Sequence, residues 1–66
     1  MPFNIERTYK EEILGEETIM IEYSTQPTLK KAKEYAYEEC QWESTIKCDI
    51  KDNHGNHIEE FRGFFA

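Results

Sequence analysis

Alternating apolar and polar segments lie on both sides of a segment with helical spacing, and this arrangement constrains the fold more than any other feature. Alternation with a period of two is typical of strands that bury one face. Turn-forming residues separate the segments within each pair: Gly15-Glu16-Glu17 in the first, and the polar residues 52–56 in the second. The sequence therefore predicts an α+β fold of order β-β-α-β-β, a four-stranded, mainly antiparallel sheet with one helix packed on one face. We expect a single small domain over residues 1–66. The strand segments are residues 3–14, 18–23, 45–51 and 57–65.

The middle segment, residues 25–42, has its apolar side chains at helical spacing. At 100° per residue, four small or apolar side chains fall on one stripe. Because three of the four are small, we expect the helix to approach the sheet closely. Ser24 or Thr25 is expected to cap the helix, with Pro27 in its first turn. The stripe consists of Leu29, Ala32, Ala36 and Cys40.

The second strand has a simple alternation that predicts its two faces. Ile19, Ile21 and Tyr23 lie on one side of the strand, and we expect this side to face the core. Met20 then lies on the outer face, either exposed or covered by another part of the molecule. The pattern thus assigns a role in the core to three large side chains.

Two other strands are irregular. In the first, Arg7 and Glu11 interrupt the apolar side, which indicates an edge strand or a bulge. In the last, the apolar residues change face along the strand. A bulge near Glu59-Glu60 would bring Ile58 and Phe61 to the same side.

The chain is short for a stable fold. A chain of 66 residues buries only ~60% of the surface that it exposes when unfolded. The chain has two leucines and no valine, so four phenylalanines, four tyrosines and one tryptophan supply most of the bulk for a core. We therefore expect marginal stability, which a disulfide, a metal or a second subunit could increase.

Membrane insertion and secretion have no support in the sequence. No apolar run approaches the ~20 residues that cross a bilayer. Residues 1–6 lack the basic and apolar regions of a secretory signal. We expect a cytoplasmic protein with no membrane partner; a secreted domain that has already lost its signal is the alternative.

The net charge of −6 is distributed unevenly, because residues 1–23 contain six acids and only two bases. Binding to nucleic-acid phosphates depends on clustered lysine and arginine. Direct binding to DNA or RNA is therefore not expected. Solubility is the simplest explanation of the acidity.

Two cysteines and two histidines are the residues most suggestive of a metal site. Structural zinc usually takes two pairs of closely spaced ligands, whereas Cys40 and Cys48 are eight positions apart and His54 and His57 belong to the second predicted turn. We therefore expect no metal and no cofactor. Both cysteines should lie between helix and sheet, as free thiols in a reducing cytosol or, alternatively, as a disulfide.

No arrangement of residues predicts catalysis. The numerous pairs of adjacent acids either point to opposite faces of a strand or lie in turns, where they are solvated, so none of them is typical of a general acid or base. The chain also lacks a glycine-rich phosphate loop and a nucleophile elbow. We expect a protein that is not an enzyme.

The leading hypothesis is a small acidic protein-interaction module of unknown partner that could also pair with itself through an edge strand. Aromatic residues concentrate binding energy at interfaces, and the candidate surface follows from them. It consists of Tyr9, Met20, Phe61, Phe64 and Phe65.

The alternative hypothesis is an acidic mimic of nucleic acid that inhibits a nucleic-acid-binding protein. Very small acidic α+β proteins of prokaryotes, phages and mobile elements often act in this way. Glutamates would then imitate phosphates, and binding should weaken as salt increases. The candidate acidic surface consists of Glu6, Glu11, Glu12, Glu16, Glu17 and Glu22.

Overall fold

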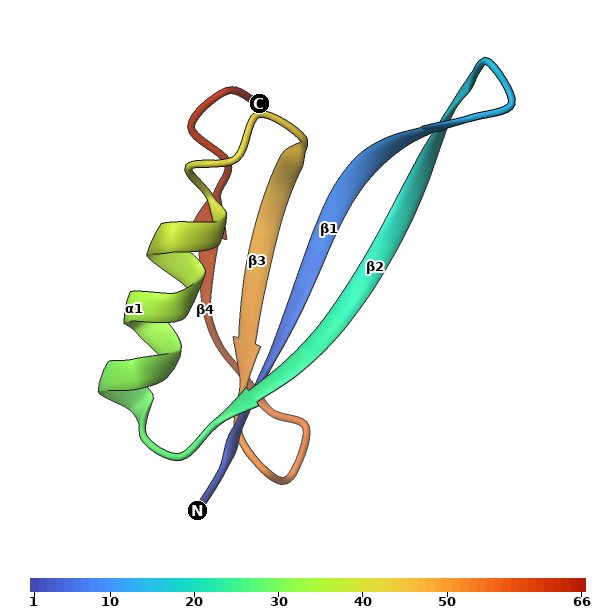
Figure 1. Ribbon diagram of the computed structural model, residues 1–66. Helices are drawn as coiled ribbons and strands as arrows, with labels where there is room; N and C mark the ends of the chain where they lie inside the picture. The colour runs from blue at the N-terminus through green and yellow to red at the C-terminus, as the bar shows by residue number, and fades with distance from the viewer.

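The computed structural model describes residues 1–66, and its elements follow the predicted order. The four strands form one sheet in the order β2-β1-β3-β4, and all neighbouring strands are antiparallel. Helix α1 packs on one face of this sheet (Figure 1). The predicted α+β fold is therefore confirmed. The elements are β1 (Phe3–Ile13), β2 (Glu16–Gln26), α1 (Leu29–Glu39), β3 (Thr45–Lys51) and β4 (His57–Arg62).

Strand β1 lies inside the sheet, between β2 and β3. Because β2 and β3 are both antiparallel to β1, they run in the same direction, and α1 connects them across β1. The β1–β2 hairpin extends far beyond the helix, and its cyan tip is the part of the chain most distant from α1 (Figure 1). The molecule is therefore elongated, with extents of 40 × 20 × 15 Å.

The helix begins at Leu29, later than predicted, and its N-cap is Thr28. The Thr28 hydroxyl accepts a hydrogen bond from the Lys31 backbone N–H at 3.1 Å. The predicted caps, Ser24 and Thr25, are wrong because both residues belong to β2. A residue that precedes proline is biased toward extended backbone, so the strand continues through the position before Pro27.

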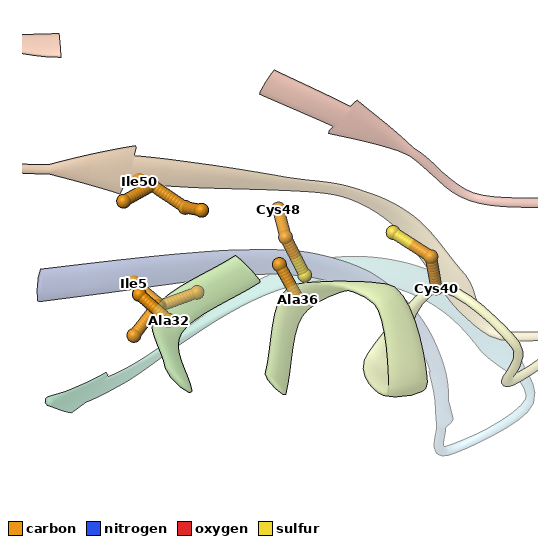
Figure 2. Packing of buried hydrophobic residues seen from close by; sticks show 6 residues of the cluster. All are labelled: Ile5, Ala32, Ala36, Cys40, Cys48 and Ile50. Atoms are coloured by element: carbon orange, nitrogen blue, oxygen red, sulfur yellow. The ribbon is translucent and has the colours of Figure 1, made fainter. Parts of the chain in front are cut away.

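The core is small and lies between α1 and the strands β1 and β3. Six side chains are completely buried (Figure 2). Three members of the predicted helical stripe are among them, and the fourth, Leu29, packs against the cluster. Small side chains on the helix allow the two isoleucines of the sheet to fill the space between the layers. The buried residues are Ile5, Ala32, Ala36, Cys40, Cys48 and Ile50.

Arg7 interrupts the apolar side of β1 because its side chain forms a polar contact beneath the helix. The side chain is only 12% exposed, and its Nε donates a hydrogen bond to Thr45 Oγ1 at 2.8 Å. Carboxylates of Glu22 and Glu39 lie 3.8 and 3.7 Å from its guanidinium. The edge-strand interpretation is wrong for β1, because this strand lies between β2 and β3. The register shift between β1 and β3 follows Thr8, but its extra residue, Ile46, belongs to β3 and not to β1.

The bulge in the last hairpin falls close to its predicted place. Ile50 pairs with Glu59 and Lys51 pairs with His57, which leaves Ile58 as the extra residue of β4. Phe61 packs against the core on the helix side, opposite Cys48, whereas Ile58 is 39% exposed. The bulge thus sets the register that places Phe61 over the core.

The faces of β2 are the reverse of the prediction. Ile5 faces the core, and its cross-strand partner is Ser24, so the even-numbered residues of β2 lie on the helix side. Ile19, Ile21 and Tyr23 consequently lie on the opposite side, 56%, 51% and 69% exposed. The cause is the length of the first turn.

That turn has two residues, Leu14 and Gly15, instead of the predicted three. Both have positive φ, 52° and 81°, as a type I′ hairpin turn requires. Ile13 therefore pairs with Glu16. Because side chains alternate with a period of two, a change of one residue in the turn moves every side chain of the following strand to the other face.

Candidate interaction surface

The sheet face opposite α1, here called the open face, has no helix over it (Figure 1). Alternate residues of all four strands point toward it. On β1, β3 and β4 these residues are mostly charged, whereas on β2 they are mostly apolar. The open face therefore has two chemically different parts, and each is described in turn.

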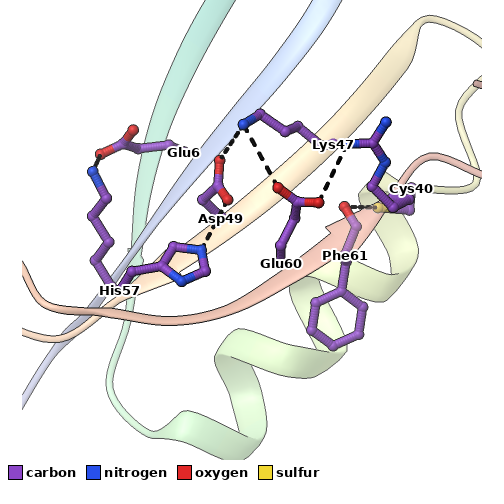
Figure 3. Close-up of polar contacts among 9 residues, drawn as sticks. Glu6, Cys40, Lys47, Asp49, His57, Glu60 and Phe61 are labelled. Atoms are coloured by element: carbon purple, nitrogen blue, oxygen red, sulfur yellow. Dashed lines mark hydrogen bonds and ion pairs between the residues drawn. The ribbon is translucent and has the colours of Figure 1, made fainter.

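The charged part, over β1, β3 and β4, is a network of ion pairs (Figure 3). Lys51 Nζ lies 2.8 Å from Glu6 Oε2, and this hydrogen bond raises the pKa of the lysine. His57 Nε2 lies 3.0 Å from Asp49 Oδ1. Exposed pairs of this kind contribute little to stability, but they leave the patch with its charges compensated. The other pairs are Lys47 with Asp49 and Glu60, and Arg62 with Glu60.

The apolar part is a stripe along β2. It consists of Ile19, Ile21 and Tyr23, here called the apolar stripe, and each member is more than half exposed. Single exposed apolar residues are common on proteins, but a continuous row on one strand indicates a contact surface. At the hairpin tip, Leu14 of the turn is 99% exposed, whereas Ile13, whose partner is Glu16, lies on the helix side and is 42% exposed.

The backbone of β2 is also available for pairing on its outer side. In a two-residue hairpin the residues that flank the turn, here Ile13 and Glu16, form a hydrogen-bonded pair, and bonded and non-bonded pairs then alternate along the strands. The even-numbered residues of β2 therefore bond to β1. The N–H and C=O groups of the odd-numbered residues, which include the whole apolar stripe, point outward from the sheet edge.

The two edges of the sheet differ in their protection against pairing. Strand β4 has six residues, a bulge at Ile58 and charged side chains at Glu59, Glu60 and Arg62, all of which discourage the addition of another strand. Strand β2 has eleven residues in unbroken register with β1, and it contains no lysine, arginine or proline. Of the two edges, β2 is the one open to a partner.

The predicted interaction residues do not form one surface. Tyr9 and Met20 are cross-strand partners on the helix side, both half-buried, and the Arg7 guanidinium lies 4.3 Å from the Tyr9 ring centroid. Phe61 packs against the core. Phe64 and Phe65 are exposed in the turn after β4, where Phe64 meets Tyr37 edge to face at 5.3 Å.

The predicted acidic residues are also divided between the two faces. The register of the first hairpin places Glu11, Glu16 and Glu22 on the helix side and Glu6, Glu12 and Glu17 on the open face. Three of the six have a basic partner, because Glu6 pairs with Lys51, Glu17 with Lys10 and Glu22 with Arg7. The acids without such a partner lie near the hairpin tip.

The cysteines and histidines lie on different parts of the molecule. Cys40 and Cys48 are free thiols, completely buried on the helix side. Burial raises the pKa of both thiols, that of Cys48 to about 12. His57 is exposed on the open face and His54 lies in the turn before it. No three histidine, cysteine or acidic side chains come together in a way that could hold a metal ion.

Sequence reasoning missed the apolar stripe as a surface because it assigned these residues to the core. The signal that could have identified them is Leu14-Gly15 read as a two-residue turn, since that alone reverses the faces of β2.

No helix of the chain is long and apolar enough to span a membrane. Comparisons of the chain with protein-family models, with curated proteins and with solved structures give no match.

Proposed function

We propose that this protein is a small non-enzymatic protein-interaction module that binds its partner along β2. One observation carries the proposal: the β2 residues with exposed apolar side chains are the same residues whose backbone groups point away from the sheet. A segment added to the sheet as a further strand would satisfy those backbone groups and cover the apolar stripe in a single contact.

The rest of the molecule supports binding rather than chemistry. Most ionisable groups on the open face compensate one another in pairs. The two thiols are buried, and their raised pKa values keep them protonated at neutral pH. The edge and the open face of β2 combine exposed apolar side chains with backbone groups that have no partner within the sheet.

The test compares a substitution on β2 with the same substitution on the other edge. Ile21→Lys places a charge in the apolar stripe, whereas Ile58→Lys is its matched control, an exposed isoleucine on β4. Tagged wild-type and variant chains would be used to capture proteins from a lysate of the source organism, followed by mass spectrometry. We expect a partner that wild type and Ile58→Lys retain and Ile21→Lys loses.

Hydrogen exchange then locates the contact. In the monomeric protein, at low protein concentration, the backbone N–H groups of Ile19, Ile21 and Tyr23 should exchange faster than those of their even-numbered neighbours, because only the latter bond to β1. The captured partner should slow the exchange of the odd-numbered residues. Protection confined to β4 or to the helix would contradict the proposal.

The salt response separates this proposal from the acidic-mimic interpretation. Binding through β2 should survive high salt, because it depends on backbone pairing and apolar contact. A nucleic-acid mimic should lose its partner as salt increases. Capture that is unaffected by Ile21→Lys but is abolished by Glu11→Lys with Glu12→Lys, near the hairpin tip, would favour the mimic.

A further inference from the structure

We infer that the segment that pairs with β2 is the β2 strand of a second copy of this chain, antiparallel and centred on Ile21. The inference rests on the proposed function and names its partner. It follows from three properties of β2: the parity of its outward backbone groups, the place of its midpoint, and the distribution of its acids.

Parity restricts how two copies can pair. Two identical antiparallel strands bond when residues with outward N–H and C=O groups lie opposite each other. On β2 these are the odd-numbered residues. The strand runs from Glu16 to Gln26, and its midpoint, Ile21, is odd-numbered. A two-fold axis at Ile21 therefore pairs all eleven residues, whereas an axis at any other residue leaves part of the strand unpaired.

This register joins the apolar stripes of the two copies. Ile21 lies opposite its own counterpart, and Ile19 lies opposite Tyr23 of the second copy. Side chains of directly opposed residues share a face and touch, so six apolar side chains form one continuous cluster on the open face. The sheet grows to eight strands, and both helices lie on its other face.

The acids of β2 are compatible with this register. Glu16 lies opposite Gln26 of the second copy, Glu17 opposite Thr25, and Glu22 opposite Met20, so no carboxylate faces another. An axis at Glu22 would instead place that residue opposite its counterpart, and an axis at Ile19 would place Glu16 opposite Glu22. Like charges directly opposite each other destabilise a sheet.

The other edge of the sheet makes the assembly closed. Two-fold pairing uses the β2 edge of both copies, and the edges that remain are the two β4 strands. Their short length, bulge and charges oppose further addition. The expected product is a closed dimer and not a filament, because an isologous contact uses the same surface of both copies.

Net charge gives the dimer a characteristic salt response. Each copy has a net charge of −6, so two copies repel each other at long range, and salt screens this repulsion. Dimerisation should therefore strengthen as salt increases. Loss of dimer on adding salt would contradict an interface that depends on the apolar stripe.

Sedimentation equilibrium over a range of concentrations and at two salt concentrations tests the dimer. We expect wild type and Ile58→Lys to reach twice the monomer mass, more readily at the higher salt. Ile21→Lys should raise the dissociation constant about 100-fold, because each dimer loses two covered isoleucine side chains. Circular dichroism checks that each variant is folded. A wild-type chain that stays monomeric at millimolar concentration would overturn the inference.

Crosslinking tests the register. In the Ile21-centred dimer, the variant Ile21→Cys should oxidise to a covalent dimer, because directly opposite residues lie within the Cα separation that a disulfide allows. Thr25→Cys is the control: it has the same outward parity, but its opposite residue is Glu17, far from the second substituted position. Equal crosslinking by the two variants would refute this register.

Failure of this inference can be told from failure of the proposed function. A monomeric wild type whose captured partner is lost only in Ile21→Lys would refute self-pairing and leave binding along β2 intact. A monomer whose capture is indifferent to Ile21→Lys would refute both.

Discussion

The turn between β1 and β2 contains a strained residue, Leu14, and replacing this residue should stabilise the protein. Leu14 has a φ of 52° and is 99% exposed, so its side chain makes almost no contact that could compensate for the strain. A left-handed conformation costs an ordinary L-residue roughly 1–2 kcal/mol, and asparagine tolerates it best among residues other than glycine. Asn-Gly is also the preferred pair for a type I′ turn.

Leu14→Asn should therefore raise the free energy of unfolding by about 0.5–1 kcal/mol, since asparagine relieves part of that strain. For a domain of this size, 1 kcal/mol corresponds to a rise in Tm of about 4–8 °C. Chemical denaturation and thermal melting, both followed by circular dichroism, would measure the change at one protein concentration.

The control is Leu14→Val, which keeps an apolar side chain but adds β-branching that suits positive φ poorly. It should be less stable than wild type. If Leu14→Asn gives no gain, or if Leu14→Val is as stable as Leu14→Asn, then the turn is not under strain at this residue. The two-residue turn would then need another explanation.

Four further predictions concern the core and the interface. Arg7→Met should lower the free energy of unfolding by about 1–3 kcal/mol, because it leaves the buried Thr45 hydroxyl without its donor. Adding Thr45→Val should recover part of this loss, which a double-mutant cycle would measure. Gly63→Ala should lower the free energy of unfolding, measured by urea titration, by about 1–3 kcal/mol, because the added Cβ would collide with the Thr45 carbonyl oxygen. The pKa of Cys48 is raised from 9.0 to about 12, so the unfolded chain releases this proton at a lower pH than the folded chain does. The free energy of unfolding should therefore fall as pH rises from about 9 toward 12. Alkylation of the thiols at pH 8 should be slow until the protein unfolds. If β2 pairs with a second copy, Tm should rise with protein concentration for wild type but not for Ile21→Lys.

The thin core gives the pairing of β2 a structural consequence. Ile5 and Ile50 are the only large aliphatic side chains among the six that are completely buried. A chain of this length has limited means of burying more surface by itself. Covering Ile19, Ile21 and Tyr23 in a dimer would add apolar burial that the monomer lacks, so folding and association should be thermodynamically linked.

Local patterns were sufficient for much of the fold. The helical stripe of Leu29, Ala32, Ala36 and Cys40 was predicted from its spacing, and the structure buries it because the 3.6-residue period is a property of the helix itself. The same holds for Cys48 on β3, which was expected between helix and sheet and is completely buried there. The order of elements followed from where these periods change.

The candidate site could not be predicted in the same way. An alternating strand such as β2 has two possible inward faces, and its own sequence does not choose between them. The choice depends on the register with β1, and that register depends on whether the turn has two residues or three. The periods in the sequence thus specify the elements and their order. The exposure of Ile19, Ile21 and Tyr23 follows instead from pairing with β1, because this pairing fixes which side of β2 meets the helix.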